Sequence, residues 1–161
     1  AYPVLDVEMR STGEVAALGS SMYDALIKSW LAAQPNYAPE RGSKVLIIAD
    51  HSGDGVVREI AGALRRLGYE PLIATPTSRD GASIEECVKL VREGRVGLAI
   101  AVSRRTNRDW DYEIRRACAD FSVPLILDLE LARHLVRALE YYLNGGEITV
   151  EPLDGLWGED R

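Results

Sequence analysis

Apolar residues from position 44 onward follow two alternating patterns. Short continuous apolar runs cover residues 44–50, 71–75, 96–102 and 123–128, and between them apolar residues recur every three or four positions. Continuous runs are typical of strands buried on both faces of a parallel sheet, and the wider spacing is typical of amphipathic helices. The sequence therefore predicts a small doubly wound α/β domain, with a parallel sheet of about four strands and helices on both faces.

Start and stop signals for helices lie between these runs. Gly68 is expected to end the helix after the first strand, and Ser83 is expected to cap the next one, with Glu86 three residues later. The last helix is expected to cover about residues 130–143. The helix after the third strand is expected to turn four residues inward: Ile114, Ala117, Cys118 and Phe121.

The first forty residues have a different organisation. Residues 20–33 have helical spacing after a pair of serines, and the following AAQPNYAPERGS has the prolines and glycine of a linker. We therefore expect three parts, with a helix and linker in residues 1–38, the α/β domain in 39–146 and a tail in 147–161. The pattern does not decide whether the tail adds an edge strand at 148–150 or lies over the surface.

Composition narrows the class of protein. The chain has 161 residues, of which 47% are hydrophobic and 27% charged, which suits one well-filled core. No apolar run approaches the ~20 residues of a membrane helix, and a net charge of -6 argues against a sequence-independent nucleic-acid binder. We expect a cytoplasmic protein. Cys87 and Cys118 lack metal-ligand spacing and are expected to be buried free thiols.

Ligands of open α/β sheets bind beyond the carboxyl ends of the strands. The loops there are residues 50–55, 75–81, 103–109 and 128–130, and two of them have groups that suit a phosphate. The candidates are the hydroxyls of Thr75, Thr77, Ser78 and Ser103 and the guanidinium groups of Arg104, Arg105 and Arg108. The alternative is that these are solvated turn and capping residues.

No catalytic residue and no metal site is predicted. His51 and Asp54 have the chemistry of a base and its orienting carboxylate, but no nucleophile accompanies them, so a structural or exposed His51 is expected. His134 is expected on a helix surface. Trp110 and Tyr112 are expected to be packing residues.

Several segments resemble one known family. The residues that carry the resemblance are MRSTGEV at 9–15, KVLIIAD at 44–50, LRRLGYE at 64–70 and DYEIRRACADFSVPLILDLELA at 111–132. Together they resemble the methylglyoxal-synthase-like domain that forms the C-terminal regulatory part of carbamoyl phosphate synthetase large subunits, preceded by the end of its ATP-grasp region. On this resemblance the chain begins where a catalytic domain ends, and its fold is Rossmann-like.

The resemblance implies an allosteric domain that holds the phosphate of a nucleotide effector in its strand-end loops. It implies partners, namely the ATP-grasp domains and the glutaminase subunit of an enzyme of pyrimidine and arginine biosynthesis. That enzyme would use ATP with Mg or Mn, whereas this chain is expected to hold no cofactor. Self-association is left open.

The pocket departs from the family pattern. The TxxT phosphate loop remains as Thr75 and Ser78, but Asp54 replaces the lysine of the first loop and would repel a phosphate. Leu125 and Leu127 replace hydroxyl-bearing residues. A short turn replaces an additional helix and strand between Thr77 and Ile84.

Three hypotheses of function follow. The first is a non-catalytic regulatory domain with a degenerate phosphate pocket. The second is a structural or oligomerisation module that binds no effector, because Asp54, Ile100 and Val102 lie in a pocket that the family pattern makes cationic and polar. The third is a stand-alone methylglyoxal-synthase-like lyase, which the missing segment weighs against.

Overall fold

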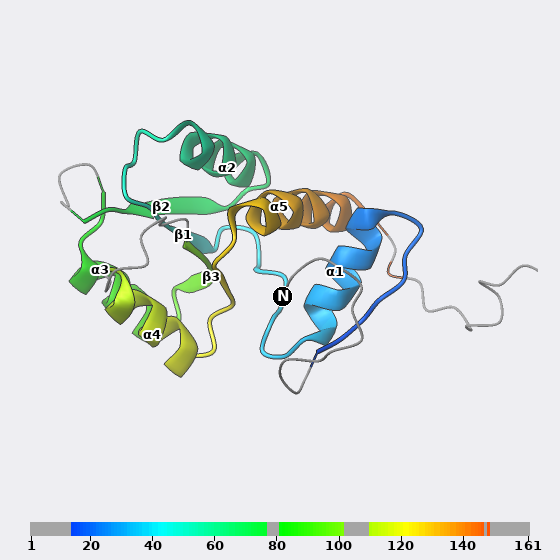
Figure 1. The fold of residues 1–161 in the computed structure, drawn as a ribbon, viewed down its shortest axis with the longest axis horizontal. Coiled ribbons are helices and arrows are strands. Elements are labelled where there is room, and N and C mark those ends of the chain that lie inside the picture. The colour runs from blue at the N-terminus through cyan, green and yellow to red at the C-terminus, as the bar shows by residue number, and fades with distance from the viewer. Residues whose placement is uncertain (1–13, 77–80, 102–109, 147, 149–161) are drawn as a thin grey trace, which may run out of the picture.

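The computed structural model of the protein describes residues 14–76, 81–101, 110–146 and 148 (Figure 1). Five helices and four strands form within these residues. In chain order they are α1 (Met22–Ala32), β1 (Lys44–Ile48), α2 (Gly55–Arg66), β2 (Glu70–Ala74), α3 (Ile84–Arg92), β3 (Val96–Ala101), α4 (Tyr112–Asp120), β4 (Leu125–Ile126) and α5 (Leu129–Leu143).

The four strands form one parallel sheet in the order β2-β1-β3-β4. The chain runs outward from β1 to β2 and then crosses to the other side of β1 to form β3, so the strand order reverses between β1 and β3. This is the doubly wound, Rossmann-like arrangement that the sequence predicts. No helix among the described residues is long and apolar enough to cross a membrane.

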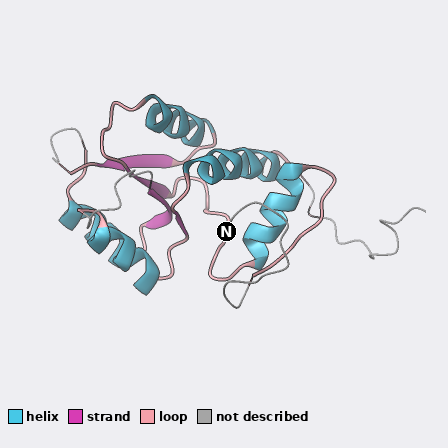
Figure 2. Ribbon diagram, viewed as in Figure 1, coloured by secondary structure: helices cyan, strands magenta, loops and turns pink. Residues whose placement is uncertain are grey.

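Helices cover both faces of the sheet, and each face has its own hydrophobic core (Figure 2). Alternate residues of β1 point to opposite faces, with Val45 and Ile47 in the core beneath α1, α2 and α5. Leu46 and Ile48 lie in the core beneath α3 and α4, and all four side chains are fully buried. The continuous apolar run of β1 is therefore explained by its burial on both faces of the sheet, as predicted.

The fourth strand is shorter than the predicted residues 123–128. The backbone N–H of Val123 donates to Cys118 O at 2.9 Å and so closes the end of α4. Pro124 has no N–H to donate, although its carbonyl accepts a hydrogen bond from Ala99 N at 2.9 Å. Only Leu125 and Ile126 are left to pair with β3.

The linker between α1 and β1 is held to both neighbouring layers. Trp30 of α1 donates its indole N–H to Tyr37 O, and Tyr69 donates its hydroxyl to Pro39 O, each at 2.9 Å. Ile27 and Trp30 belong to the same core as α5 and the sheet. Thus α1 and the sheet share one core.

Three predictions about single side chains are wrong. Phe121 is 50% exposed because it is the C-cap of α4, one residue beyond the turn that faces the core. Tyr112 begins α4 on its outer side and is 54% exposed, whereas Trp110 packs against the α3–α4 core. His134 is half-buried because α1 covers that part of α5, and its ring lies 6.4 Å from the ring of Tyr23.

Both cysteines are buried and free, as predicted. Cys87 of α3 and Cys118 of α4 lie in the same core. Burial raises the pKa of each thiol to about 11, so both are protonated at neutral pH.

Candidate functional site

Thr75 is the one predicted phosphate ligand that lies within the described residues. It follows β2 directly, at the carboxyl edge of the sheet, and is only 2% exposed. Its hydroxyl oxygen is buried and has no hydrogen-bond partner in the described part of the chain. A buried hydroxyl normally has a partner, so this one has unused capacity to bind a ligand group. The six other candidates lie outside the described residues: Thr77, Ser78, Ser103, Arg104, Arg105 and Arg108.

The loop after Thr75 returns alongside β2. Ala82 N donates to Ile73 O at 2.9 Å, and Ala82 forms a single parallel bridge with Ala74. Gly81 allows this close approach, since a Cβ there would lie 2.4 Å from Ile73 O. Gly81 and Ala82 therefore lie beside the end of β2, at the edge of the sheet where ligands of open α/β folds bind.

Two carboxylates occupy helix N-termini at the same edge. Asp54 caps α2 by accepting from Val56 N at 2.9 Å, and Asp128 caps α5 by accepting from Leu131 N at 2.7 Å. A free helix N-terminus attracts anions, but each of these two N-termini already binds the carboxylate of its own capping residue. Asp54 therefore has a structural role in α2 instead of orienting His51, which is exposed.

Two apolar side chains lie in or beside the neighbouring strands, where the family pattern has polar groups. Ile100 of β3 is fully buried in the core, and Leu127 just beyond β4 is 63% exposed. Among the described residues no group of three histidines, cysteines or carboxylates could hold a metal ion. At this edge the described residues therefore include one unpartnered hydroxyl, two capping carboxylates and the carboxylate of Asp50 just after β1.

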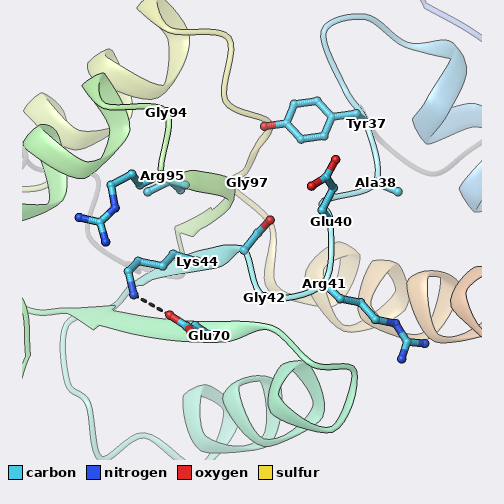
Figure 3. A pocket seen from close by; sticks show the side chains of 12 residues that line it. Tyr37, Ala38, Glu40, Arg41, Gly42, Lys44, Glu70, Gly94, Arg95 and Gly97 are labelled. Carbon is cyan, nitrogen blue, oxygen red and sulfur yellow. Dashed lines mark hydrogen bonds and ion pairs between the residues drawn. The ribbon is translucent and has the colours of Figure 1, made fainter.

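A hollow that the sequence analysis did not find lies at the opposite, amino edge of the sheet (Figure 3). Its volume is about 700 Å³, and its walls come from the linker at residues 37–43, the starts of β1 and β2, and the turn before β3 at residues 94–97. We call it the amino-edge hollow. Lys44 begins one apolar run, and Glu70 and Arg95 directly precede two others, which is the sequence signal that marks this edge.

One ion pair lies inside the amino-edge hollow. Lys44 Nζ donates to Glu70 Oε2 at 2.6 Å, across the first residues of β1 and β2. This hydrogen bond, with the charges of Lys44 and Arg95, holds the pKa of the Glu70 carboxyl below its ordinary value of 4.5. Arg41 points away from the pair in Figure 3 and donates to Leu143 O of α5 at 3.4 Å.

An irregularity in β3 shapes the hollow. Lys44 pairs with Val96 and Val45 pairs with Leu98, so Gly97 is an extra residue in the ladder. A Cβ at Gly97 would lie 2.9 Å from Pro39 Cβ and 3.1 Å from Ser43 Cβ. The glycine therefore lets the linker lie directly against the bulge, and bulges often lie beside functional sites.

Comparison with known proteins gives one consistent group of relatives, although no protein-family model matches the chain. The chain is 40% identical over 142 residues to the carbamoyl phosphate synthase large chain of Pyrococcus furiosus, which covers 88% of this chain. It is 42% identical over 143 residues to that of Hyperthermus butylicus, covering 86%, and 35% identical over 152 residues to that of Pyrobaculum aerophilum, covering 94%. The chain spans only 13% to 14% of the length of these relatives.

Proposed function

Because this chain is homologous to a segment of carbamoyl phosphate synthase large chains, we propose that it is the C-terminal regulatory domain of such a large chain or of a paralogue. The observation that carries the proposal is similarity over 88% of the chain to 13% of a relative, which is the extent of a single domain. Carbamoyl phosphate synthesis would then take place elsewhere on the polypeptide, on ATP-grasp domains served by a glutaminase subunit. The domain itself would be non-catalytic and methylglyoxal-synthase-like.

The effector of this domain would be a nucleotide held by its phosphate at the carboxyl edge. The buried hydroxyl of Thr75 supports this proposal, because a phosphate oxygen would give it the partner it lacks. Asp54 and Asp128 oppose tight binding, since each places a negative charge at a helix N-terminus where a phosphate would otherwise bind. We therefore expect weak binding in a pocket that is degenerate relative to the family pattern.

Calorimetry with UMP and IMP tests the proposal. Saturable binding in the micromolar range is expected, and Thr75→Val should weaken it roughly tenfold, the scale of one hydrogen bond to a charged group. The variant should fold at least as stably as the wild type, because the hydroxyl that it removes has no partner. Arg105→Ala should weaken binding similarly if that loop reaches the phosphate.

The second candidate is a structural or oligomerisation module. Asp54, Asp128 and the buried Ile100 favour it, because two carboxylates and an apolar side chain do not attract a phosphate. No heat of binding with either nucleotide would support this module and refute the regulatory proposal. Incubation with dihydroxyacetone phosphate should yield no methylglyoxal; sustained turnover would refute both and favour a lyase.

A further inference from the structure

We propose that the amino-edge hollow is a second binding site, which holds the phosphate or carboxylate group of a small anionic metabolite. It lies at the amino ends of the strands, opposite the carboxyl edge that contains Thr75. The proposal therefore does not depend on nucleotide binding at the carboxyl edge. It rests on the charges, the exposure and the backbone geometry of the hollow.

The first argument is local charge. The whole chain has a net charge of -6, but the left wall of the hollow in Figure 3 presents two cations, Lys44 and Arg95, with one carboxylate, Glu70, beside them. Both cations contribute to lowering the pKa of Glu70, so the charges of all three side chains act on one another. Arg95 Nη1 also lies 3.9 Å from an oxygen of Glu93, which does not line the hollow. Among the side chains that line this wall, two cations accompany one carboxylate, and this local excess of positive charge favours an anion.

The second argument is that Glu70 already occupies the position of an anion and can leave it. The Lys44–Glu70 pair spans a water-accessible surface, where the Glu70 side chain is 62% exposed. Exposed ion pairs contribute little to stability, so moving the Glu70 carboxylate into water costs little. A ligand oxyanion would then accept the hydrogen bond of Lys44 and gain the charge of Arg95, which is itself 59% exposed.

The third argument is the opposite wall. Tyr37 and Glu40 of the linker face the cationic wall across the hollow in Figure 3, and Ser43 also lines the hollow. Glu40 can accept a hydrogen bond from a hydroxyl or ammonium group, and the Ser43 hydroxyl can donate one to an oxyanion. A ligand with an anionic group at one end and a hydrogen-bond donor at the other matches this pair of walls.

A ligand in this position would touch both the linker and the sheet. Gly97 lets the linker lie against the β3 bulge, and Tyr69 fixes the Pro39 carbonyl from the other side. The hollow thus lies between the segment that carries α1 and the strands of the domain. Binding would stabilise that junction, because a ligand that binds only the folded state stabilises it.

Titration with inorganic phosphate, followed by NMR of the backbone amides of Gly42, Gly94 and Gly97, tests the proposal. Ionic strength is held constant with potassium chloride, and acetate in a parallel series distinguishes a carboxylate site from a phosphate site. Saturable shifts at these amides are expected with at least one of the two anions. Shifts that do not saturate would overturn the proposal.

Two variants with opposite expected effects and one control variant sharpen the test. Lys44→Gln should weaken binding roughly tenfold because it removes a charge-assisted hydrogen bond, and Glu70→Gln should tighten it a few-fold, roughly, because the competing carboxylate is gone. Arg116→Gln is the control, since Arg116 is 62% exposed on α4, pairs with Asp120 and does not line this hollow. Equal weakening in Arg116→Gln and Lys44→Gln, or weaker binding in Glu70→Gln, would overturn the proposal.

The proposals for the two sites can be refuted independently of one another. Thr75→Val should leave the phosphate shifts at Gly42, Gly94 and Gly97 unchanged, because Thr75 lies at the other edge of the sheet. Loss of those shifts in Thr75→Val would overturn the amino-edge site. Absence of nucleotide binding at the carboxyl edge would refute only the proposed regulatory function.

Discussion

Replacing Ile27 by alanine should destabilise the whole domain, although Ile27 lies before the linker. Its side chain is fully buried in the core shared by α1, α5 and the sheet. The change removes three buried carbon groups, each worth roughly 0.8 kcal/mol in transfer free energy, or about 2.4 kcal/mol in total. The cavity left behind adds to this cost, and measured losses for such changes are about 2 to 5 kcal/mol.

Urea unfolding followed by far-UV circular dichroism measures this loss. Ile27→Val should cost about 0.5 to 1.5 kcal/mol, and Met22→Ala, on the same helix but 55% exposed, should stay within about 0.5 kcal/mol of the wild type. Hydrogen exchange of α1 and β3 amides shows whether the two elements open together. A loss below about 0.5 kcal/mol in Ile27→Ala, or α1 amides that exchange independently of β3, would refute a shared core.

Three further predictions concern charge and protonation. Cys87 and Cys118 are buried, so they should react with a thiol reagent only as fast as the chain unfolds. Because the pKa of each thiol in the folded chain is about 11, the stability that their protonation contributes should be lost as pH rises from 9.0 toward 11. Urea melts of a double variant with both cysteines changed to alanine should lack this loss. The hydrogen bond from Lys28 helps to hold the pKa of Asp24 below its ordinary value of 3.8. The ionised Asp24 carboxylate should therefore contribute stability above pH 3.8, and this contribution should be lost on further acidification. In the same urea melts, the stability of Asp24→Asn should fall less steeply with decreasing pH than that of the wild type. Asp54→Lys should cost about 1 kcal/mol of stability through the lost α2 cap and should tighten nucleotide binding at the carboxyl edge in calorimetry; unchanged binding would argue against a phosphate site beside α2.

Local chemistry made most of the fold predictable. The apolar run of β1 predicted burial on two faces, and Ser83 predicted the start of α3, where it accepts from Glu86 N at 3.1 Å. Predictions failed where a distant element decided the outcome. His134 follows the pattern of a surface residue and is half-buried only because α1 packs over it. Phe121 failed for a local reason, since the helix ended one residue too early to turn it inward.

For the candidate sites too, local sequence predicted some features, and others depended on packing between distant residues. The strand-end rule placed Thr75 at the carboxyl edge from the sequence alone, because it needs only the order of strands and loops. The rule could not show that the Thr75 hydroxyl is buried without a partner, since that depends on the packing around it. The amino-edge hollow depends on the bulge at Gly97 and on where Pro39 lies against it, and no local pattern encodes a contact across 58 residues of chain.

The two hydrogen bonds that hold the linker make its length as important as its composition. Trp30 of α1 and Tyr69, which lies between α2 and β2, donate to the carbonyls of Tyr37 and Pro39, which are two residues apart. Both bonds are to backbone carbonyls, which every amino acid provides, so many substitutions at these two positions leave them intact. Inserting or deleting one residue between the two carbonyls would shift one of them out of reach. The segment therefore behaves as a spacer of fixed length, and a rotation of the sheet would be transmitted to α1 instead of being absorbed between them.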